Sequence, residues 1–227
     1  MRKAQAQLGE KRIGAPAGPR AANVAETKDR ILRAAIGQFA QHGFSGARIE
    51  AICADANVNG RMVYHYYVDK AGLYLAVLEH VLGELRIEEL KLDVSTSEPM
   101  AGLLTMFEFT FGHFSKHPEL IRLLSAENLS EARTLRTSQQ TPIVASPVIA
   151  QISELLRRGE ADGTIRHGID PVHLYVVMVA LSYFHKSNAY TLAIIFGSHL
   201  LSEPWLADHR DVAREVLLSF LRAPASK

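Results

Sequence analysis

The feature that most constrains the fold is a pair of short amphipathic segments separated by a three-residue turn. Residues 49–56 carry apolar side chains at i, i+3, i+4 and i+7, the period of a helix with one buried face: Ile49, Ile52, Cys53 and Ala56. Asn57 follows, and asparagine is one of the few residues besides glycine that tolerates the left-handed conformation at a helix end. Val58 would then fill the core, and Asn59 would cap the next helix. Two helices joined in this way form a helix-turn-helix.

A longer helix is predicted before this pair. Thr27 can cap its first turn, and Gly43 supplies a left-handed stop after His42. Between them, apolar residues recur at helical spacing: Ile31, Ala34, Ala35 and Phe39. We therefore predict a three-helix domain over residues 25–71.

The segment before this domain, residues 1–24, has no apolar period and is rich in Ala, Gly, Pro, Arg, Lys and Gln. It is predicted to be a disordered basic arm. Such an arm is either a dispensable tail or a source of additional attraction to phosphates or to a minor groove. The first of these interpretations is favoured.

The second helix of the pair, Gly60 to Tyr67, has an unusual composition for a structural helix. Val63 and Tyr67 are spaced i, i+4 and are expected to face inward. The remaining surface would then carry Arg61, Met62, Tyr64, His65 and Tyr66. The arginine, the imidazole and the tyrosine hydroxyls among them suit hydrogen bonds to base edges and phosphates in a major groove. Lys70 opens the following helix, where a cation opposes the helix dipole. That position indicates a phosphate partner, although an ordinary solvated lysine would also fit it.

Apolar, turn and aromatic residues recur at fixed spacings over roughly residues 27–80: Gly43-Phe44-Ser45-Gly46-Ala47-Arg48-Ile49, Ile52, Ala56-Asn57-Val58-Asn59, Val63-Tyr64-His65-Tyr66-Tyr67, Lys70 and Leu73. This pattern resembles the signature of the TetR family of transcriptional regulators. The resemblance implies a homodimeric repressor that binds a palindromic operator in double-stranded DNA and is released by a small-molecule effector. The candidate DNA-binding residues are Arg48, Asn59, Gly60, Arg61, Met62, Tyr64, His65, Tyr66 and Lys70.

Three positions depart from the family pattern, which commonly has Thr, Gly and Ser where this chain has Ala47, Asn57 and Asn59. The two asparagines keep the chemistry of the turn and the cap. Ala47 lacks a hydroxyl that could cap the second helix and contact a phosphate. Arg48 is a candidate to replace that contact with a phosphate bond of its own.

The remaining residues, 72–227, are predicted to form an all-α bundle for ligand binding and dimerisation, with about nine helices in the whole chain. Helices are expected at Lys70–Leu92, from Pro99, from Ser146-Pro147 to near Gly163, from Asp170-Pro171, and at Asp208–Leu221. The helix after Pro99 is expected to be central, and the one after Pro171 is apolar nearly all round from Leu174 to Phe184, so it should be buried. Residues 129–145 are predicted to be a loop or an irregular short helix. The family resemblance implies that the last two long helices pack against their copies in a second subunit.

Aromatic residues and one methionine in this bundle are candidates for lining an effector pocket: Phe107, Phe111, Phe114, Tyr175, Met178, Tyr183 and Phe184. Each of them fits plain core at least as well. His113, His117, His173 and His185 are predicted to be ordinary histidines, because no metal-binding motif accompanies them. No metal and no cofactor are predicted.

Charge and composition restrict the kinds of function that this chain can have. Residues 1–70 hold 11 Lys and Arg against 6 Asp and Glu, whereas the remainder holds 14 against 18, which fits a phosphate-facing module joined to an acidic body. The chain has neither a long apolar span nor a signal peptide, so a cytoplasmic protein is expected, with its single cysteine, Cys53, reduced. No catalytic motif favours an enzyme or a small-molecule carrier. A DNA-binding protein whose body only dimerises is the remaining alternative.

Overall fold

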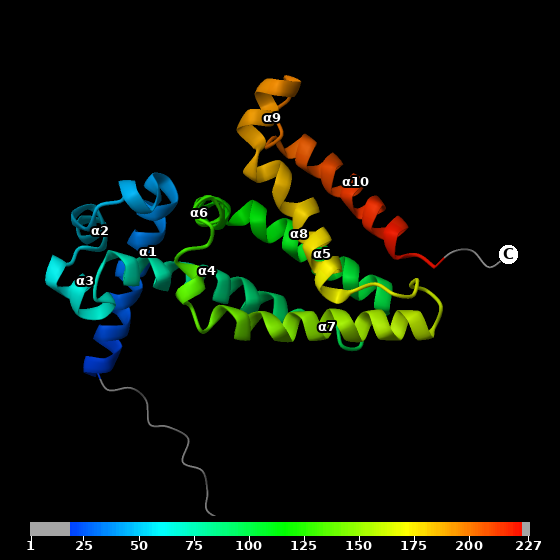
Figure 1. The fold of residues 1–227 in the computed structure, drawn as a ribbon, viewed down its shortest axis with the longest axis horizontal. Helices are drawn as coiled ribbons and strands as arrows, with labels where there is room; N and C mark the ends of the chain where they lie inside the picture. Colours follow the sequence, from blue (N-terminus) through cyan, green and yellow to red (C-terminus); the bar gives the residue numbers. More distant parts are fainter. Residues whose placement is uncertain (1–18, 224–227) are drawn as a thin grey trace, which may run out of the picture.

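The computed structural model describes residues 19–223, except for the side chains of residues 19–22 and 141–146. This part of the chain is all-α: it contains ten α-helices and one short 3-10 helix, and no strand (Figure 1). The helices are α1 (Pro19–Gly46), α2 (Ile49–Ala56), α3 (Gly60–Tyr67), α4 (Lys70–Leu90), α5 (Pro99–Lys116), α6 (Pro118–Leu129), η1 (Leu135–Thr137), α7 (Thr141–Ala161), α8 (Pro171–Ser187), α9 (Ala189–Phe196) and α10 (Glu203–Leu221). The predicted fold class is confirmed, with one α-helix more than expected.

Helices α1, α2 and α3 and the beginning of α4 enclose one core. Its centre is fully buried, with side chains from all four helices in contact: Ile31, Phe39, Ile52, Val63 and Leu73. Leu123 of α6 belongs to the same cluster, so this core continues into the body of the molecule. In Figure 1 the three helices form the lobe at the left, from which α4 runs into the larger bundle.

The first helix begins earlier than predicted. It starts at Pro19, a residue that suits a first turn because its missing N–H would have no intrahelical partner there. Thr27 therefore lies inside α1, where its hydroxyl donates to the carbonyl of Asn23 at 2.8 Å, and it does not cap the helix. Residues 19–24 of the expected arm are helical, and residues 1–18 lie outside the described residues. Gly43 has the predicted positive φ, +66°, but with ψ 177° it kinks α1, which continues beyond it to Gly46, so Gly43 does not end the helix as predicted.

The larger bundle is built around α5, as predicted. Leu103, Met106 and Phe107 of this helix are at most 2% exposed and contact side chains of α7, α8 and α10. Helix α7 lies alongside α4 along the lower edge of Figure 1, and α8 and α10 cross α5 above it. No described helix has the length and the apolar character needed to cross a membrane.

Several helix boundaries differ from the prediction. Helix α7 starts at Thr141, so Pro147 lies within it, and α10 starts at Glu203, ahead of the predicted Asp208. Two helices, α6 and α9, were not predicted. The sequence of α9, AYTLAIIF, is apolar on every side and has no polar face to reveal a helical period. Residues 129–145 were expected to form a loop or an irregular short helix, and η1, a 3-10 helix of three residues, lies within this segment.

Helix α8 is buried on one side only, which corrects the expectation for this segment. Leu174, Met178 and Ser182 are fully buried, whereas Val176 and Phe184 are 57% and 59% exposed. The helix lies on α5 and α7 with one face, and residues 19–223 leave Val172, Val176 and Phe184 on its opposite face exposed. A continuous apolar run indicates burial but does not say which chain covers each side.

Candidate nucleic-acid interface and ligand cavity

The turn between α2 and α3 has the predicted chemistry. Asn57 is left-handed, with φ 50° and ψ 55°, and Val58 N–H donates to the carbonyl of Cys53 at 3.0 Å, which closes the end of α2. Asn59 caps α3, because its side-chain Oδ1 accepts from the backbone N–H of Met62 at 3.2 Å. These local contacts fix the angle at which α3 crosses α2.

Helix α3 turns a buried stripe to the core and a polar stripe to solvent. Val63 is fully buried, while Arg61, Tyr64 and His65 are exposed, Tyr64 by 52%. Spacings of i, i+3 and i+4 place these three exposed side chains on one face of the helix.

Met62 and Tyr66, which were expected on the surface of α3, are only partly exposed and pack against the N-terminal core. They flank Val63 and Tyr67 on the helix, so the buried stripe is two residues wide. The amine of Lys28 lies 5.3 Å from the centre of the Tyr66 ring, and the Tyr67 hydroxyl donates to the carbonyl of Lys28 at 3.1 Å. The outward face of α3 is therefore narrower than predicted.

The two flanking basic residues have different surroundings. Arg48 is exposed at the N-cap of α2, and its side chain makes no capping bond there, so its guanidinium is free to reach outward. Lys70 is partly exposed, with its amine 3.4 Å from the carbonyl of Ser45 and 5.0 Å from the centre of the Phe44 ring. The unfavourable dipole position of Lys70 is offset by the carboxylate of Asp69, which caps α4 at 2.7 Å from the N–H of Gly72.

The junction between α3 and α4 is unusually tight, which sequence reasoning missed. Val68 has φ +67° and ψ −56°, and the next N–H, that of Asp69, donates to the carbonyl of Tyr67 at 2.7 Å. A branched residue in this region is strained. A side chain on Gly72 would place its Cβ 2.2 Å from that same carbonyl oxygen, so only glycine fits there. The junction holds α3 at a fixed angle to α4.

A cavity of about 500 Å³ lies in the larger bundle, among α5, α6, α8, α9 and α10. Its wall is mostly apolar but includes two basic side chains, Arg122 and Lys186. The lining residues are Phe114, Ser115, Pro118, Ile121, Arg122, Ser125, Ala126, Leu129, Lys186, Ser187, Tyr190, Leu201 and Leu206.

The structure does not bring the seven predicted pocket residues together in this cavity. Phe114 lines it, and the hydroxyl of Tyr183 is 2.8 Å from the hydroxyl of Ser125, which also lines it. The other five lie elsewhere. Phe107, Phe111, Tyr175 and Met178 pack in the central core, and Phe184 is on the outer side of α8. Periodicity along a helix identifies its apolar face but not where several helices leave a gap.

Lys186 is the residue of the cavity wall that sequence reasoning should have found, because it is a cation in an apolar helix. It is 7% exposed, and its amine lies 3.1 Å from the carbonyl of Ser182, 2.9 Å from His185 Nε2 and 3.8 Å from the centre of the Phe111 ring. Burial lowers the pKa of Lys186 to about 8. Burial first, and then the nearby amine, lower the pKa of His185 to about 3, so the imidazole is neutral and can accept from that amine.

Comparison with known proteins follows the same division of the chain. Residues 31–77 match the family model described as bacterial regulatory proteins, tetR family, and residues 99–217 match that of the tetracyclin repressor-like C-terminal domain. The chain belongs to the TetR family.

The two relatives described next match 90% and 69% of this chain. The HTH-type transcriptional repressor NicS of Pseudomonas putida is 32% identical over 90% of this chain and 97% of its own length. The HTH-type transcriptional repressor SCO4008 of Streptomyces coelicolor is 32% identical over 69% of this chain and 76% of its own length. Among solved structures, the transcriptional regulator SCO4942 of Streptomyces coelicolor superimposes with a TM-score of 0.64 at 25% identity, covering 87% of this chain and 99% of that one. The protein is therefore a helix-turn-helix, DNA-binding transcriptional regulator of a family that includes repressors.

Proposed function

We propose that the protein is a homodimeric repressor that binds a palindromic operator through α3 and Arg48, and that a small acidic molecule in the cavity of the larger bundle releases it. The observation that carries the DNA-binding half is the polar face of α3. Arg61, Tyr64 and His65 are exposed together on a helix whose two ends are fixed by the Asn59 cap and the junction at Gly72.

These three side chains have the donors and acceptors that base edges and phosphates require. Asn59 and Gly60 lie at the N-terminus of α3, where backbone N–H groups attract phosphate. Arg48 and Lys70 would add phosphate contacts beside the groove. Met62 and Tyr66 are the weaker candidates, because most of their surface is used to hold α3 against the core.

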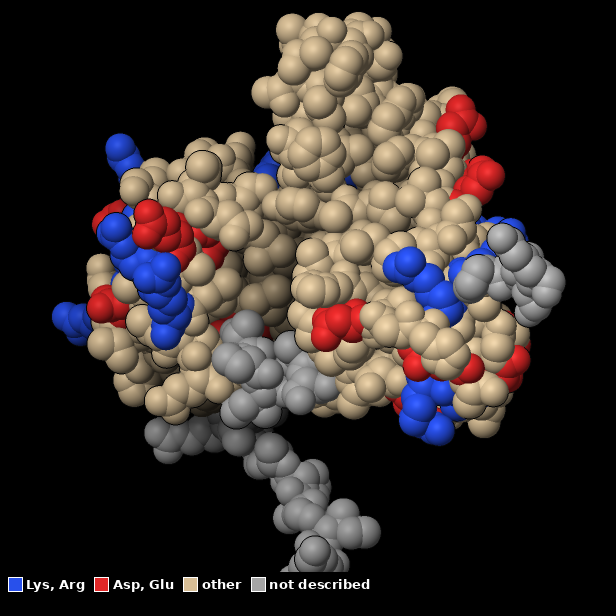
Figure 2. Space-filling view, turned by 45° about the vertical axis from the view of Figure 1, so that its right-hand side comes forward, with Lys and Arg blue, Asp and Glu red and all other residues tan. Residues whose placement is uncertain are grey.

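The dimer is supported by an apolar surface on the side of the bundle away from the α1–α3 lobe. One stripe of α8, its continuation on α9, and one stripe of α10 are at least half exposed: Val172, Val176, Phe184, Tyr190, Ile194, Ile195, Phe196, Val212 and Val216. In Figure 2 the upper end of the molecule, where Figure 1 places α9, shows no charged side chain on the face in view. A monomer rarely exposes so large an apolar patch. A second copy of the chain can cover this patch, because a two-fold axis brings the same patch of both copies into contact.

A dimer would present two copies of α3 about 34–36 Å apart, one helical turn of DNA, and would read a palindrome. The effector acts by differential affinity: it binds more tightly to the arrangement whose α3 helices do not fit the operator. Helix α4 is the proposed transmission element, because it leaves the tight junction with α3 and continues into the bundle. Arg122 and Lys186 in the cavity favour an acidic effector.

The DNA-binding half is tested by selecting bound sequences from a random pool and then measuring operator affinity. A palindrome should emerge from the selection. Arg61→Ala should weaken operator binding by about 1–3 kcal/mol. Arg48→Ala should make operator affinity less dependent on salt concentration, by the amount expected for the loss of about one phosphate contact. Arg157→Ala is the matched control, because Arg157 is an exposed arginine of α7 that pairs with Glu154. Full operator affinity of Arg48→Ala would contradict its assigned phosphate contact.

The effector half is tested with small carboxylic acids and their neutral amides as a matched panel. Trp205 is the single tryptophan of the chain and stacks on His209 in the first half of α10, next to Leu206 of the cavity wall, so its fluorescence should report binding. An acid that binds should lower operator affinity, and Lys186→Met should weaken the acid but not its amide. Equal operator affinity with and without a bound acid would remove effector release from the proposal.

A further inference from the structure

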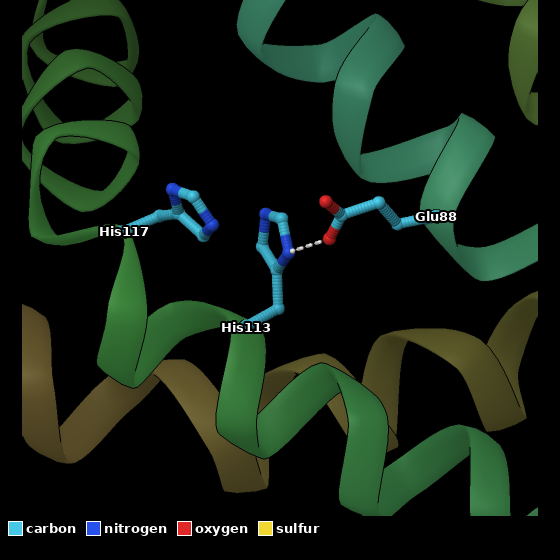
Figure 3. Close-up of side chains that lie close together, drawn as sticks. All are labelled: Glu88, His113 and His117. Carbon is cyan, nitrogen blue, oxygen red and sulfur yellow. Dashed lines mark hydrogen bonds and ion pairs between the residues drawn. The ribbon is translucent and has the colours of Figure 1, made fainter.

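Three side chains with metal-binding atoms converge between α4 and the C-terminal end of α5, in a pocket that shares no lining residue with the cavity described above. Glu88 of α4, His113 of α5 and His117, the cap residue between α5 and α6, each offer one ligand atom, and these atoms all lie within 4.8 Å of one another (Figure 3). His113 Nδ1 is 3.1 Å from Glu88 Oε2. No spacing along the chain indicates this group, because 25 residues separate Glu88 from His113.

We propose that Glu88, His113 and His117 form a binding site for a divalent transition-metal ion of the Zn²⁺ type. Two imidazoles and one carboxylate are a ligand set that suits Zn²⁺ and its neighbours in the first transition row. Mg²⁺ and Ca²⁺ prefer an all-oxygen site and are not expected here. The site is independent of the operator and effector assignments and can be tested without either.

The distances between the three groups are close to those that a bound ion requires. In a tetrahedral site with ligands about 2.0–2.1 Å from zinc, neighbouring ligand atoms are roughly 3.4 Å apart. The Glu88 to His113 separation of 3.1 Å already meets this, and an ion would replace the proton that now joins them. The widest separation, at most 4.8 Å, must close by an amount that a side-chain rotation supplies.

The surroundings of the three side chains also suit a metal site. They line a cavity of about 210 Å³ together with His80 and Glu84, which are candidates for a fourth ligand, with Glu119, and with the apolar side chains of Ile36, Val81 and Leu120. His80 and Glu84 precede Glu88 by two turns and one turn on the same side of α4.

Glu119 holds one nitrogen of His117. His117 Nδ1 lies 3.0 Å from Glu119 Oε1, an arrangement that in metal sites fixes the imidazole and leaves Nε2 for the ion. His113 is 5% exposed, and burial, followed by the proximity of His117, lowers its pKa.

The test uses the full chain without any affinity tag, stripped with a chelator and titrated with Zn²⁺ by calorimetry. We expect one ion bound per chain. Glu88→Gln and His117→Ala should each weaken binding roughly tenfold or more, since the loss of an outer partner alone costs that much. Both side chains are 41% exposed, so these variants should keep the melting temperature of the metal-free protein, unlike a change at the buried His113.

The matched control is His167→Ala, because His167 is an exposed histidine that also faces a carboxylate, that of Glu160 at 3.6 Å. This variant should bind Zn²⁺ as tightly as the unchanged protein. Titration with Co²⁺ gives a second readout, since imidazole ligands produce visible absorption bands that should be lost in His117→Ala. The proposal is overturned if the stripped protein binds no Zn²⁺ saturably, or if Glu88→Gln and His117→Ala bind it as the unchanged protein does.

Discussion

At the scale of single residues, the junction between α3 and α4 depends on the absence of one side chain. A Cβ on Gly72 would lie 2.2 Å from the carbonyl oxygen of Tyr67, which is backbone and cannot rotate away. Gly72→Ala should therefore open the junction and lower the free energy of unfolding by about 2 kcal/mol. Chemical denaturation monitored by circular dichroism measures this change.

Gly83 of the same helix is the matched control, because a Cβ there meets nothing within 4 Å. Gly83→Ala should raise the free energy of unfolding by about 0.5–1 kcal/mol, the ordinary gain of alanine over glycine inside a helix. Equal effects of the two substitutions would show that the junction is not tight. Because Gly72 sets the angle of α3, Gly72→Ala should also weaken operator binding where Gly83→Ala does not.

At the scale of helices, the parts of the fold that could be predicted are those whose chemistry is local. The end of α2, the turn and the cap of α3 each depend on residues within five positions of one another, such as Asn57 and Asn59. The partial burial of Met62 and Tyr66 depends on α1, which lies some 30 residues earlier in the chain. Helix α9 has no polar face, so no period marks it.

The candidate sites divide in the same way. The polar face of α3 could be predicted because it lies on one eight-residue helix. The cavity wall combines residues of five helices, and the group formed by Glu88, His113 and His117 combines two. Convergence of this kind depends on how helices pack, which no spacing within one helix records.

Helix α8 carries a buried cation, and this predicts a pH dependence of stability. Burial lowers the pKa of Lys186 from 10.5 to about 8, so between these values the unfolded chain binds more protons than the folded one. Stability therefore rises with pH across this window, while below pH 8 both states hold the proton and the cost of the buried charge is fully present. Lys186→Met, which lacks that charge, should be more stable than the unchanged protein at pH 7.

The advantage of Lys186→Met should shrink as the pH rises from about 8 towards 10.5. The lowering of the pKa from 10.5 to about 8 corresponds to roughly 3 kcal/mol. Because each kcal/mol shifts the melting temperature of a chain of this size by about 2–4 °C, the difference in melting temperature should narrow by about 6–12 °C over the whole window. Groups that titrate in both proteins cancel in that difference. Lys116→Met replaces an exposed lysine of α5, and its difference from the unchanged protein should not vary with pH. A constant difference for Lys186→Met would mean that the folded and unfolded chains bind the same number of protons, so that burial does not lower the pKa of Lys186.

At the scale of the whole molecule, the proposed function requires a second copy of the chain, because it assigns operator binding to a pair of α3 helices. The α1–α3 lobe presents one α3, and one α3 meets only half of a palindrome. The apolar stripes of α8 and α10 are the surface through which a second copy would be held. Dimerisation and operator affinity should therefore be lost together.

Val176→Glu tests this link, because Val176 is 57% exposed in the middle of the α8 stripe and a carboxylate there would have to be buried without a partner in a dimer. Light scattering after size exclusion should show the variant as a monomer where the unchanged protein is a dimer. Its operator affinity should fall to the level of binding to unrelated DNA, while its melting temperature as a monomer is preserved. Ile87→Glu is the matched control, since Ile87 is 49% exposed on α4, outside the stripes, and it should remain dimeric. A dimeric Val176→Glu would assign the two-fold contact to another face, and a monomer with full operator affinity would separate DNA recognition from dimerisation.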